Sequence, residues 1–384
     1  MIRVLHITED HSARNFGISG AVDALARCMP EGIQPAIACT GTETIPLPPE
    51  ARLYAFPTAG LARSWRFSPG AARQLEAAVS AADVVHVHGL WMWIQWAAAR
   101  EARRQGKPFV LSVHGMLEPW IWQRQRWPHR LKKYLYWKGL GYPAFRRAAA
   151  VHALTPREAG TLEAYFPAQL PVIIPNGIDL DAVDAALKDL PPPVSDAAPY
   201  ILFLGRLHPV KAIHLLIRAF ARLPQGRLRL VIAGPAQPQE QAYADGLHSL
   251  VAELGLEAQV SFTGAVTGAA KWQLYRDAWA VCLPSYTEGL SLVALEAAAC
   301  RTPVITTHES GVVAEWGRCG GILVYPEEGS IMAGLDHAQG WLPAERKAHG
   351  ETLRALVERR YGWETVGRQW AGEYERLMGA GAHV

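Results

Sequence analysis

Residues 200–220, YILFLGRLHPVKAIHLLIRAF, contain the repeating unit from which the fold can be predicted. The apolar run YILFL is typical of a buried strand, and an apolar helical pattern begins after Lys211. Gly205 lies at the turn between them. Strands that are apolar on both faces and alternate with helices indicate a parallel sheet with helices on each side. The stretch therefore predicts one unit of a doubly wound α/β domain.

Similar β-branched runs recur along the whole chain. They are RVLHIT, QPAIAC, DVVHVH, PFVLSVH, AVHALT and PVIIP in the first half, and YILFLG, LRLVIAG, QVSFTG, WAVCLP, PVITT and GILVY in the second. Because twelve strands are too many for one comfortable sheet, we expect two doubly wound parallel-sheet (Rossmann-like) domains facing across a cleft. We expect a domain at 1–186, a proline-rich linker at 187–199, a second domain at 200–362 and a closing helix at 363–384.

The composition is that of a globular protein, since half of the 384 residues are hydrophobic and 19% are charged. A net charge of +3 does not indicate nucleic-acid binding. Five scattered cysteines predict a reduced protein without disulfides or a zinc site. The N-terminus MIRVLHITED is not a signal peptide and no transmembrane run occurs. We therefore expect a cytoplasmic protein that is able to bind the inner face of the membrane peripherally.

Two cations, Arg206 and Lys211, lie on the loop that leads into the helix of the opening stretch. A helix N-terminus favours anions through its free N–H groups and its dipole, so these cations suit a phosphate or diphosphate. A second interpretation is that both are solvated surface cations beside the loop.

The stretch PSYTEGLSLVALEA, residues 284–297, contains Glu288 and Glu296 with seven residues between them. Glu296 interrupts an apolar run that predicts a buried helix, where a charge is costly unless it is paired. We expect the two carboxylates to face ligand hydroxyl groups, or Glu296 to be a core carboxylate paired, for example, with Arg206. The N–H groups between them suit a phosphate and belong to Gly289, Leu290, Ser291 and Leu292.

Two strands end in histidine followed by glycine, HVHG and SVHG. His86 and His88 share one face of their strand, but no third ligand lies at a convincing distance in sequence, so we predict no metal site. His114, at the end of the other strand, is the better candidate for a polar contact with a ligand. Gly17, after the first strand, allows close approach of backbone to a ligand or is a simple turn glycine.

An ordered set of motifs resembles the retaining nucleotide-sugar glycosyltransferases of family 4, which have the two-domain GT-B fold. The motifs are GRLHPVK (205–211), FTGAV (262–266), PSYTEGLSLVALEAAACRTPVI (284–305), PNGID (175–179) and SVHG (112–115). The resemblance covers nearly the whole chain. It implies that Glu288 and Glu296, the EX7E pair, contact the donor's sugar hydroxyls and ribose diol, and that Arg206 and Lys211 hold its diphosphate.

The same resemblance gives roles to four further residues. It implies that His114 contacts the transferred sugar, that Gly17 brings backbone near the phosphates, and that the loop from Gly264 to Val266 meets the base. Ala212 and Arg301 depart from the family, which has glycine at both positions. We expect alanine to suit the helix start, whereas Arg301 adds a cation behind the site.

The resemblance also implies the chemistry, substitution at the anomeric carbon with retained configuration and without an obligatory metal or other cofactor. The donor is a nucleoside-diphosphate sugar, with a UDP-sugar favoured over a GDP-sugar. The expected role is a hexosyltransferase of exopolysaccharide, capsule or lipopolysaccharide biosynthesis.

Residues 116–138 interleave tryptophan with arginine and lysine. This composition is typical of a membrane interface, so we expect contact with anionic membrane and a saccharide or polyprenyl-diphosphate-linked saccharide as acceptor. The alternative is an ordinary surface whose tryptophans pack in the core.

Two other functions remain open from the residues alone. A glycoside hydrolase would use Glu288 and Glu296 as acid and nucleophile, but it would have no use for Arg206 and Lys211. A non-catalytic sugar-binding protein is the third possibility.

Overall fold

The computed structural model describes residues 1–12, 17–41, 46–47, 51–58, 65–118, 127–192, 198–224 and 228–380. The chain forms two compact units. Unit 1 consists of Met1–Gly177 and Trp363–Val384, and unit 2 of Ile178–Gly362.

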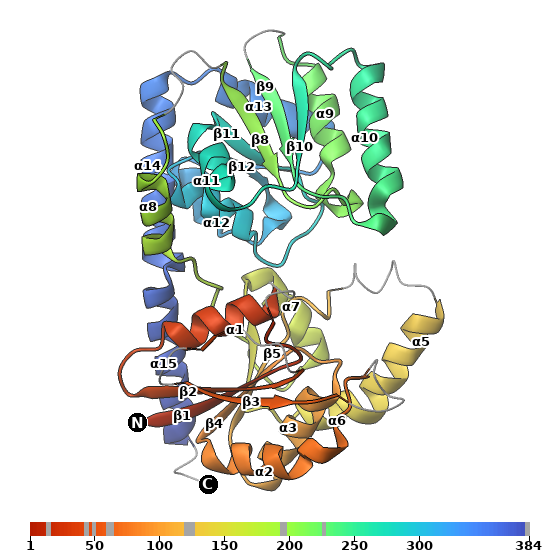
Figure 1. Ribbon diagram of the computed structural model, residues 1–384, viewed down its shortest axis with the longest axis vertical. Helices are drawn as coiled ribbons and strands as arrows, with labels where there is room; N and C mark the ends of the chain where they lie inside the picture. Colours follow the sequence, from red (N-terminus) through yellow and green to blue (C-terminus); the bar gives the residue numbers. More distant parts are fainter. Residues whose placement is uncertain are drawn as a thin grey trace. The chain divides into compact units, whose positions relative to one another are not determined.

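Unit 1 is built on a seven-stranded parallel sheet in the order β3-β2-β1-β4-β5-β6-β7 (Figure 1). Its strands are β1 (Ile2–Thr8), β2 (Ile33–Thr40), β3 (Arg52–Phe56), β4 (Val84–His88), β5 (Phe109–Ser112), β6 (Ala150–Ala153) and β7 (Val172–Ile173). Its helices are α1 (Ile18–Arg27), α2 (Ala72–Ala81), α3 (Trp93–Arg104), α5 (Trp127–Tyr136), α6 (Tyr142–Phe145), α7 (Pro156–Tyr165) and α15 (Trp363–Ala380), with the 3₁₀ helix η2 (Pro69–Ala71) and the π-helix η3 (Trp137–Gly141).

Unit 2 is built on a six-stranded parallel sheet in the order β10-β9-β8-β11-β12-β13. Its strands are β8 (Tyr200–Leu204), β9 (Arg229–Ala233), β10 (Val260–Gly264), β11 (Ala280–Leu283), β12 (Val304–Thr307) and β13 (Ile322–Val324). Its helices are α8 (Leu180–Lys188), α9 (Ile213–Ala221), α10 (Gln241–Glu253), α11 (Gly268–Asp277), α12 (Leu292–Ala299), α13 (Glu328–Gln339) and α14 (Pro343–Tyr361), with the short turns η4 (Pro209–Lys211), η5 (Pro238–Glu240), η6 (His308–Ser310) and η7 (Ala314–Cys319).

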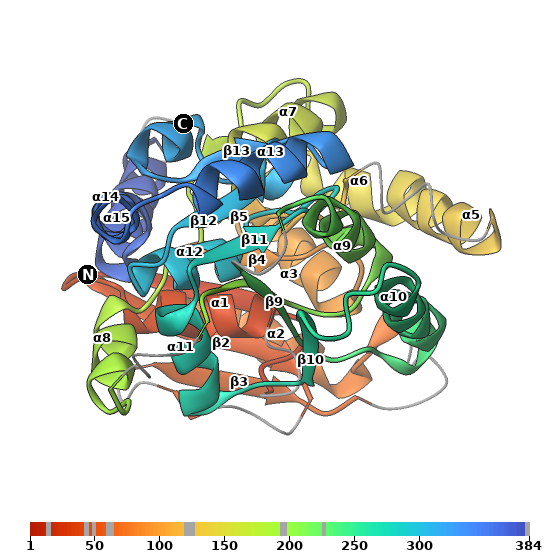
Figure 2. The same ribbon diagram turned by 90° about the horizontal axis from the view of Figure 1, so that it is seen from above.

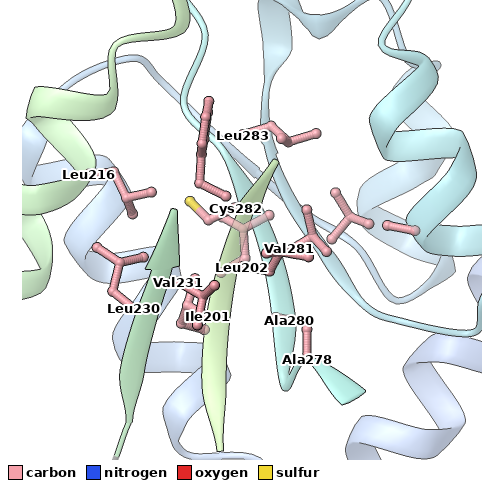
Figure 3. Packing of buried hydrophobic residues seen from close by; sticks show 14 of the residues in the cluster. Ile201, Leu202, Leu216, Leu230, Val231, Ala278, Ala280, Val281, Cys282 and Leu283 are labelled. Atoms are coloured by element: carbon pink, nitrogen blue, oxygen red, sulfur yellow. The ribbon is translucent and has the colours of Figure 1, made fainter. Parts of the chain in front are cut away.

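The core of unit 2 explains why the sequences of its strands are apolar at nearly every position. Ile201, Leu202, Val281 and Cys282 are fully buried between the helices that cover the two faces of the sheet (Figures 2 and 3). A parallel sheet buried on both faces needs apolar side chains at every position. The predicted class of two doubly wound parallel sheets is thus confirmed.

The sequence prediction missed one strand, β3. This five-residue strand lies at the edge of the unit 1 sheet, and of its residues only Phe56 is buried. A short, half-exposed edge strand lacks the apolar run by which the other twelve were recognised.

The boundary between Gly362 and Trp363 lies where it was expected, whereas the first boundary differs from the expected division. The chain enters unit 2 after Gly177, ten residues before the proline-rich stretch, because α8 packs on α11 and α12. The predicted C-terminal helix is present as α15, and it packs on α1 and β4 of unit 1 (Figure 1). Within the described residues, no helix is long and apolar enough to cross a membrane.

Candidate functional site

Closely packed glycines shape the carboxyl edge of the unit 2 sheet. Gly234 follows β9 with a φ of +144°, and a Cβ atom there would overlap the carbonyl oxygen of Gly205. The Gly205 N–H donates to the Ala233 carbonyl at 2.9 Å, and the Gly234 N–H donates to the Gly264 carbonyl at 2.7 Å. These bonds hold the ends of β8, β9 and β10 together, at the edge where doubly wound sheets bind ligands.

Arg206 and Lys211 both lie on the loop that follows β8. Arg206 is exposed, and no described residue forms an ion pair or hydrogen bond with its guanidinium group. His208 caps η4 by accepting a hydrogen bond from the Val210 N–H at 3.0 Å. This cap orients the turn so that the Nζ of Lys211 lies 3.1 Å from the Oε2 of Glu288. The structure therefore brings two of the predicted residues, Lys211 and Glu288, into direct contact.

The loop that carries Glu288 is held on several sides. The Ser285 hydroxyl donates to the Glu288 Oε1 at 2.5 Å, and the Glu288 N–H donates to the Glu309 carbonyl at 2.9 Å. Gly311 has a φ of +76°, and a Cβ atom there would overlap the carbonyl oxygen of Gly289. The Glu288 carboxylate is thus fixed before any ligand binds.

Glu296 lies on the second turn of α12, as predicted, but its partners differ from the expected one. Its Oε1 lies 2.9 Å from the Lys271 Nζ, and its Oε2 accepts a hydrogen bond from the Tyr275 hydroxyl at 2.8 Å. Its side chain keeps 25% exposure. The suggested pair with Arg206 is therefore wrong, because α11 supplies a nearer cation and a hydroxyl group.

The segment between the two glutamates forms the N-terminus of α12. Ser291 is the cap, since its side chain accepts a hydrogen bond from the Ala294 N–H at 3.4 Å. Leu292 is 44% exposed, so the run interpreted as a buried helix in fact has one apolar side chain in the open. Gly289 and Leu290 precede the cap and are partly exposed.

The predicted base loop follows β10. Gly264 ends that strand with a φ of +69°, next to a shift in register against β9. Val266 is half-buried two residues further on. The predicted donor-site residues thus lie at or after the carboxyl ends of strands of one sheet: Arg206, Lys211, Gly264, Val266 and Glu288.

Gly17 and His114 belong to unit 1 and follow β1 and β5 of its sheet. Gly17 has a φ of −68°, and a Cβ atom there would meet no atom of the described residues within 4 Å, so packing against them does not demand glycine. His114 has a φ of +53°, which is strained for any residue except glycine. Such strain is concentrated at functional positions.

Five histidines meet at the carboxyl half of the unit 1 sheet. They are His6, His86, His88, His114 and His152. Burial lowers the pKa of His6 to about 3 and that of His152 to about 4, and the pKa values of His86 and His88 also lie well below the usual range. His6 was missed in the search for a third metal ligand, because only the pairing of β1 with β4 places it opposite His86. Nitrogen atoms of His6, His86 and His88 all lie within 4.8 Å of one another.

The two departures from the family pattern both fall at left-handed backbone positions. Ala212 has a φ of +50° and Arg301 a φ of +58°. Alanine at the helix start is therefore not neutral as expected, since a left-handed conformation costs a non-glycine residue about 1–2 kcal/mol. The Arg301 side chain lies 3.2 Å from Glu351 and 3.7 Å from Asp184, which accounts for the cation.

Comparison with known families matches the two parts of the chain separately. Residues 17–182 match the family described as Glycosyltransferase Family 4, and residues 191–330 match Glycosyl transferases group 1. The D-inositol 3-phosphate glycosyltransferase of Mycobacterium tuberculosis is 32% identical over 230 residues, which is 58% of this chain and 47% of that protein. The chain thus spans about half the length of such curated relatives.

Solved structures with the same fold cover nearly the whole chain. Sucrose-phosphate synthase from Thermosynechococcus elongatus has a TM-score of 0.72 at 22% identity, with 99% of this chain and 100% of that chain covered. Anabaena HepE in complex with UDP and glucose has a TM-score of 0.71 at 19% identity, with 98% and 100% covered. These similarities confirm the GT-B fold class that the motifs implied.

Proposed function

Since the chain belongs to the group 1 and family 4 glycosyltransferases, we propose that it transfers a hexose-type sugar from a nucleoside-diphosphate sugar to a saccharide acceptor, with retention at the anomeric carbon. The observation that carries the proposal is the contact of Lys211 with Glu288 at the carboxyl edge of the unit 2 sheet. A cation that suits a diphosphate is thereby adjacent to a carboxylate that suits sugar hydroxyls. The diphosphate and the sugar are likewise adjacent in a nucleoside-diphosphate sugar.

The donor diphosphate lies against Arg206 and Lys211 in this proposal. The exposed guanidinium group of Arg206 is free to form a bidentate contact with phosphate oxygens. Lys211 keeps 20% exposure of its side chain beside Glu288, so one donor can reach a phosphate while another stays on the carboxylate. UDP is the favoured nucleotide, because a structure of the same fold binds UDP and glucose, and GDP is the second candidate.

Glu296 takes the ribose diol in this arrangement. Lys271 donates to one carboxylate oxygen of Glu296 and Tyr275 donates to the other. Each oxygen retains a second lone pair, and the side chain is one-quarter exposed, so two ribose hydroxyl groups can donate to it. The loop from Gly264 to Val266 then lies toward the base, and the backbone at Gly17 toward the phosphates.

The reaction needs stabilisation of the charge that builds on the leaving diphosphate. Arg206, Lys211 and the N–H groups at the start of α12 supply it, in place of a divalent ion. The acceptor oxygen attacks the anomeric carbon on the face that the diphosphate leaves. The C–O bond to the diphosphate breaks with its electron pair, and a diphosphate oxygen takes the acceptor's proton. His114 contacts the transferred sugar.

The contacts of Glu288 and Glu296 disfavour the glycoside hydrolase. Each carboxylate forms an ion pair with a lysine, at 3.1 Å for Glu288 and 2.9 Å for Glu296, and such fixed partners suit binding residues. The two glutamates are therefore binding carboxylates in our proposal.

The donor side is tested by single alanine substitutions. Arg206→Ala and Lys211→Ala are each expected to lower kcat for nucleotide release by about a hundredfold or more, the effect of removing a donor from developing charge. The matched controls are Arg229→Ala, at the amino end of β9, and Lys347→Ala, on the surface of α14; both should leave kcat unchanged. Near-normal turnover in both site variants would refute the assignment, as would a product with inverted anomeric configuration.

The acceptor side is proposed from a cavity of about 650 Å³ in unit 1. The loop after β3 supplies Trp65, the loop after β4 supplies Trp91 and Met92, and the segment after β5 supplies the rest. All three connections leave the carboxyl edge of the sheet, which is also the edge that carries His114. The other lining residues are His129, Lys132, Lys133, Tyr136 and Leu140.

The chemistry of this cavity suits an amphiphilic anion. Its walls are aromatic, with Trp91 and Tyr136 at 5.8 Å between ring centroids, and the Lys133 Nζ lies 4.9 Å from the Trp91 ring centroid. Two lysines and a histidine surround it, and the described lining includes no carboxylate. Aromatic side chains pack against isoprenoid groups or the faces of sugar rings, and the cations bind phosphate. We therefore favour a polyprenyl-diphosphate-linked saccharide as acceptor, in exopolysaccharide, capsule or lipopolysaccharide biosynthesis.

Helix α5 suggests that this acceptor is met at a membrane. Trp127 is 74% exposed, and none of the ten residues of the helix is buried. Figures 1 and 2 both show α5 projecting from the rest of unit 1. Trp137, in contrast, packs in the core, so the tryptophan-rich stretch divides between the two interpretations. Trp120 and Trp122 lie outside the described residues.

Vesicle sedimentation tests the membrane part. The full chain should bind vesicles that contain anionic lipid at low salt, and the double variant Lys132→Glu with Lys138→Glu should bind much less, since each cation near an anionic surface contributes about 1 kcal/mol. Arg73→Glu with Lys347→Glu makes the same change in net charge at exposed positions elsewhere and should bind nearly as well as wild type. Equal losses in both double variants, or no binding by wild type, would contradict the proposal.

A further inference from the structure

A chain of three histidines extends from the interior of unit 1 to the loop that follows β5. The Nδ1 of His6 lies 3.1 Å from the Nε2 of His88, and the Nδ1 of His88 lies 3.0 Å from the Nε2 of His114. His6 and His88 are buried, whereas His114 is half-buried. The Nδ1 of His114 has no hydrogen bond with any described residue, so this nitrogen can meet a ligand. We call His6, His88 and His114 the histidine chain.

A second chain of hydrogen bonds lies beside it, and its direction can be derived. The His152 Nε2 lies 2.7 Å from the Ile174 carbonyl, which only accepts, so this nitrogen carries the proton. The Nδ1 of neutral His152 must then accept from the Ser112 hydroxyl at 2.7 Å. Ser112 in turn accepts from the His86 Nε2 at 2.6 Å, and the His86 Nδ1 accepts from the Tyr374 hydroxyl at 2.8 Å. Every member of this second chain is satisfied.

The histidine chain has two arrangements of protons. Because burial keeps His6 and His88 neutral, each ring carries one proton, and the donors all point the same way. If they point inward, the Nε2 of His6 carries an N–H group. If they point outward, that nitrogen has only a lone pair.

The environment of His6 selects between these arrangements. Its Nε2 is buried, and no described residue forms a hydrogen bond with it. Buried N–H groups without an acceptor are rarer and more costly than buried acceptors without a donor. The outward arrangement is therefore favoured, in which His6 donates to His88, His88 donates to His114, and the His114 Nδ1 carries a proton.

We propose that His6 and His88 are positioning residues that hold His114 in its Nδ1–H form, so that it donates a hydrogen bond to an oxygen of the transferred sugar. This inference rests on the proposed function, which places His114 against the donor. The backbone of His114 is fixed as well, because the buried Glu158 carboxylate accepts the Gly115 N–H at 2.5 Å and the Leu154 N–H at 2.7 Å. Both the ring and the loop are thus set before substrate arrives.

A divalent metal ion is the competing occupant of this cluster. His6, His86 and His88 could offer three nitrogens, but both ring nitrogens of His86 are already used by Tyr374 and Ser112. The rings of His86 and His88 also stack, with centroids 3.9 Å apart and planes at 27°. A metal ion lies near the plane of each imidazole that binds it, and stacked rings do not converge on one point. Hydrogen bonding therefore accounts for the cluster better than a metal ion does.

The test is the protonation of the His114 ring, read from the full chain labelled with ¹⁵N-histidine. Long-range ¹H–¹⁵N spectra distinguish protonated from unprotonated ring nitrogens, and His114→Gln assigns the signals. We expect a protonated Nδ1 and an unprotonated Nε2 between about pH 6 and 8, where the neutral ring prevails. The reverse pattern, or a stoichiometric amount of bound transition metal in the purified protein, would overturn the proposal.

Two substitutions at His6 test whether the chain transmits this preference. The side-chain amide of His6→Asn keeps an N–H group near the Nδ1 position and should preserve the His114 pattern. His6→Leu has no donor, so His114 should show a mixture of both forms, with kcat lower by about fivefold or more, the value of one hydrogen bond. A wild-type pattern in His6→Leu would overturn the proposal; if that variant does not fold, the wild-type and His6→Asn spectra still decide it. These spectra do not depend on turnover, so inactivity with every nucleotide sugar would refute the proposed function separately.

Discussion

Unit 1 should unfold in mild acid at a pH where unit 2 remains folded. Four histidines in its interior, His6, His86, His88 and His152, are at most 3% exposed and have lowered pKa values. In the unfolded chain they regain a pKa near 6.5. The native state therefore binds fewer protons than the unfolded state below that pH, and its stability falls as the pH falls from 6.5 toward 3 or 4.

The size of the effect follows from the number of buried rings. At pH 5.5 each neutral histidine costs about 1.4 kcal/mol relative to the protonated unfolded chain, so four cost about 6 kcal/mol. A domain is stable by about 5–15 kcal/mol in total. None of the described histidines of unit 2 is buried, and burial lowers the pKa of the half-buried His214, so that unit should lose much less.

Urea unfolding of the full chain at several pH values measures how the unfolding free energy of each unit depends on pH. Hydrogen exchange of peptides from β4 and β11 assigns each transition to a unit. The unfolding free energy of unit 1 should fall with a slope approaching four protons between pH 5.5 and 4.5. His6→Asn should reduce the slope by about one proton, whereas His337→Gln, at an exposed position of unit 2, should not change it. A slope of one proton or less in wild type would refute the assignment of these histidines as buried and neutral.

Three further substitutions test local features of unit 2. Ala212→Gly should raise the unfolding free energy by up to about 1 kcal/mol, because it relieves a left-handed alanine, and a decrease would contradict that origin. Gly311→Ala should lower the unfolding free energy by about 1–3 kcal/mol and weaken UDP binding, since its Cβ would displace Gly289; calorimetry that shows unchanged affinity would argue against a rigid loop. Lys271→Met should weaken UDP binding by about tenfold, because Glu296 loses its cation, and equal affinity would show that Tyr275 alone orients that carboxylate.

The fold could be predicted from the sequence because buried parallel strands leave an unambiguous signal. Their apolar runs depend on burial of both faces, which is a property of each strand alone. The edge strand β3 has no such property, and its pairing with β2 is visible only in three dimensions. The first unit boundary was displaced for a similar reason. Prolines mark where a helix cannot continue, but the packing of α8 and α15 decides to which unit each belongs.

The ends of strands and the spacing of residues within motifs predicted only part of the candidate site. The positions of Arg206, Lys211 and Glu288 follow from the strands that precede them. The partners of Glu296 do not, because Lys271 and Tyr275 lie on a different helix, more than twenty residues away in sequence. His6 was likewise missed, since its neighbours on β4 are eighty residues further along the chain. Side-chain pairs that depend on strand order are accessible only from the structure.

The central claim is that the carboxyl edge of the unit 2 sheet holds a nucleoside diphosphate through residues with separate roles. Calorimetric titration of UDP and of uridine into wild type, Lys211→Ala and Glu296→Gln tests it most directly. Lys211→Ala should lower the affinity for UDP by about tenfold to a hundredfold, which corresponds to the loss of one charged hydrogen bond. It should leave the affinity for uridine unchanged. Glu296→Gln should weaken both ligands by a similar factor. If Lys211→Ala binds UDP as wild type does, or loses UDP and uridine equally, the assignment of this edge to the donor diphosphate is wrong.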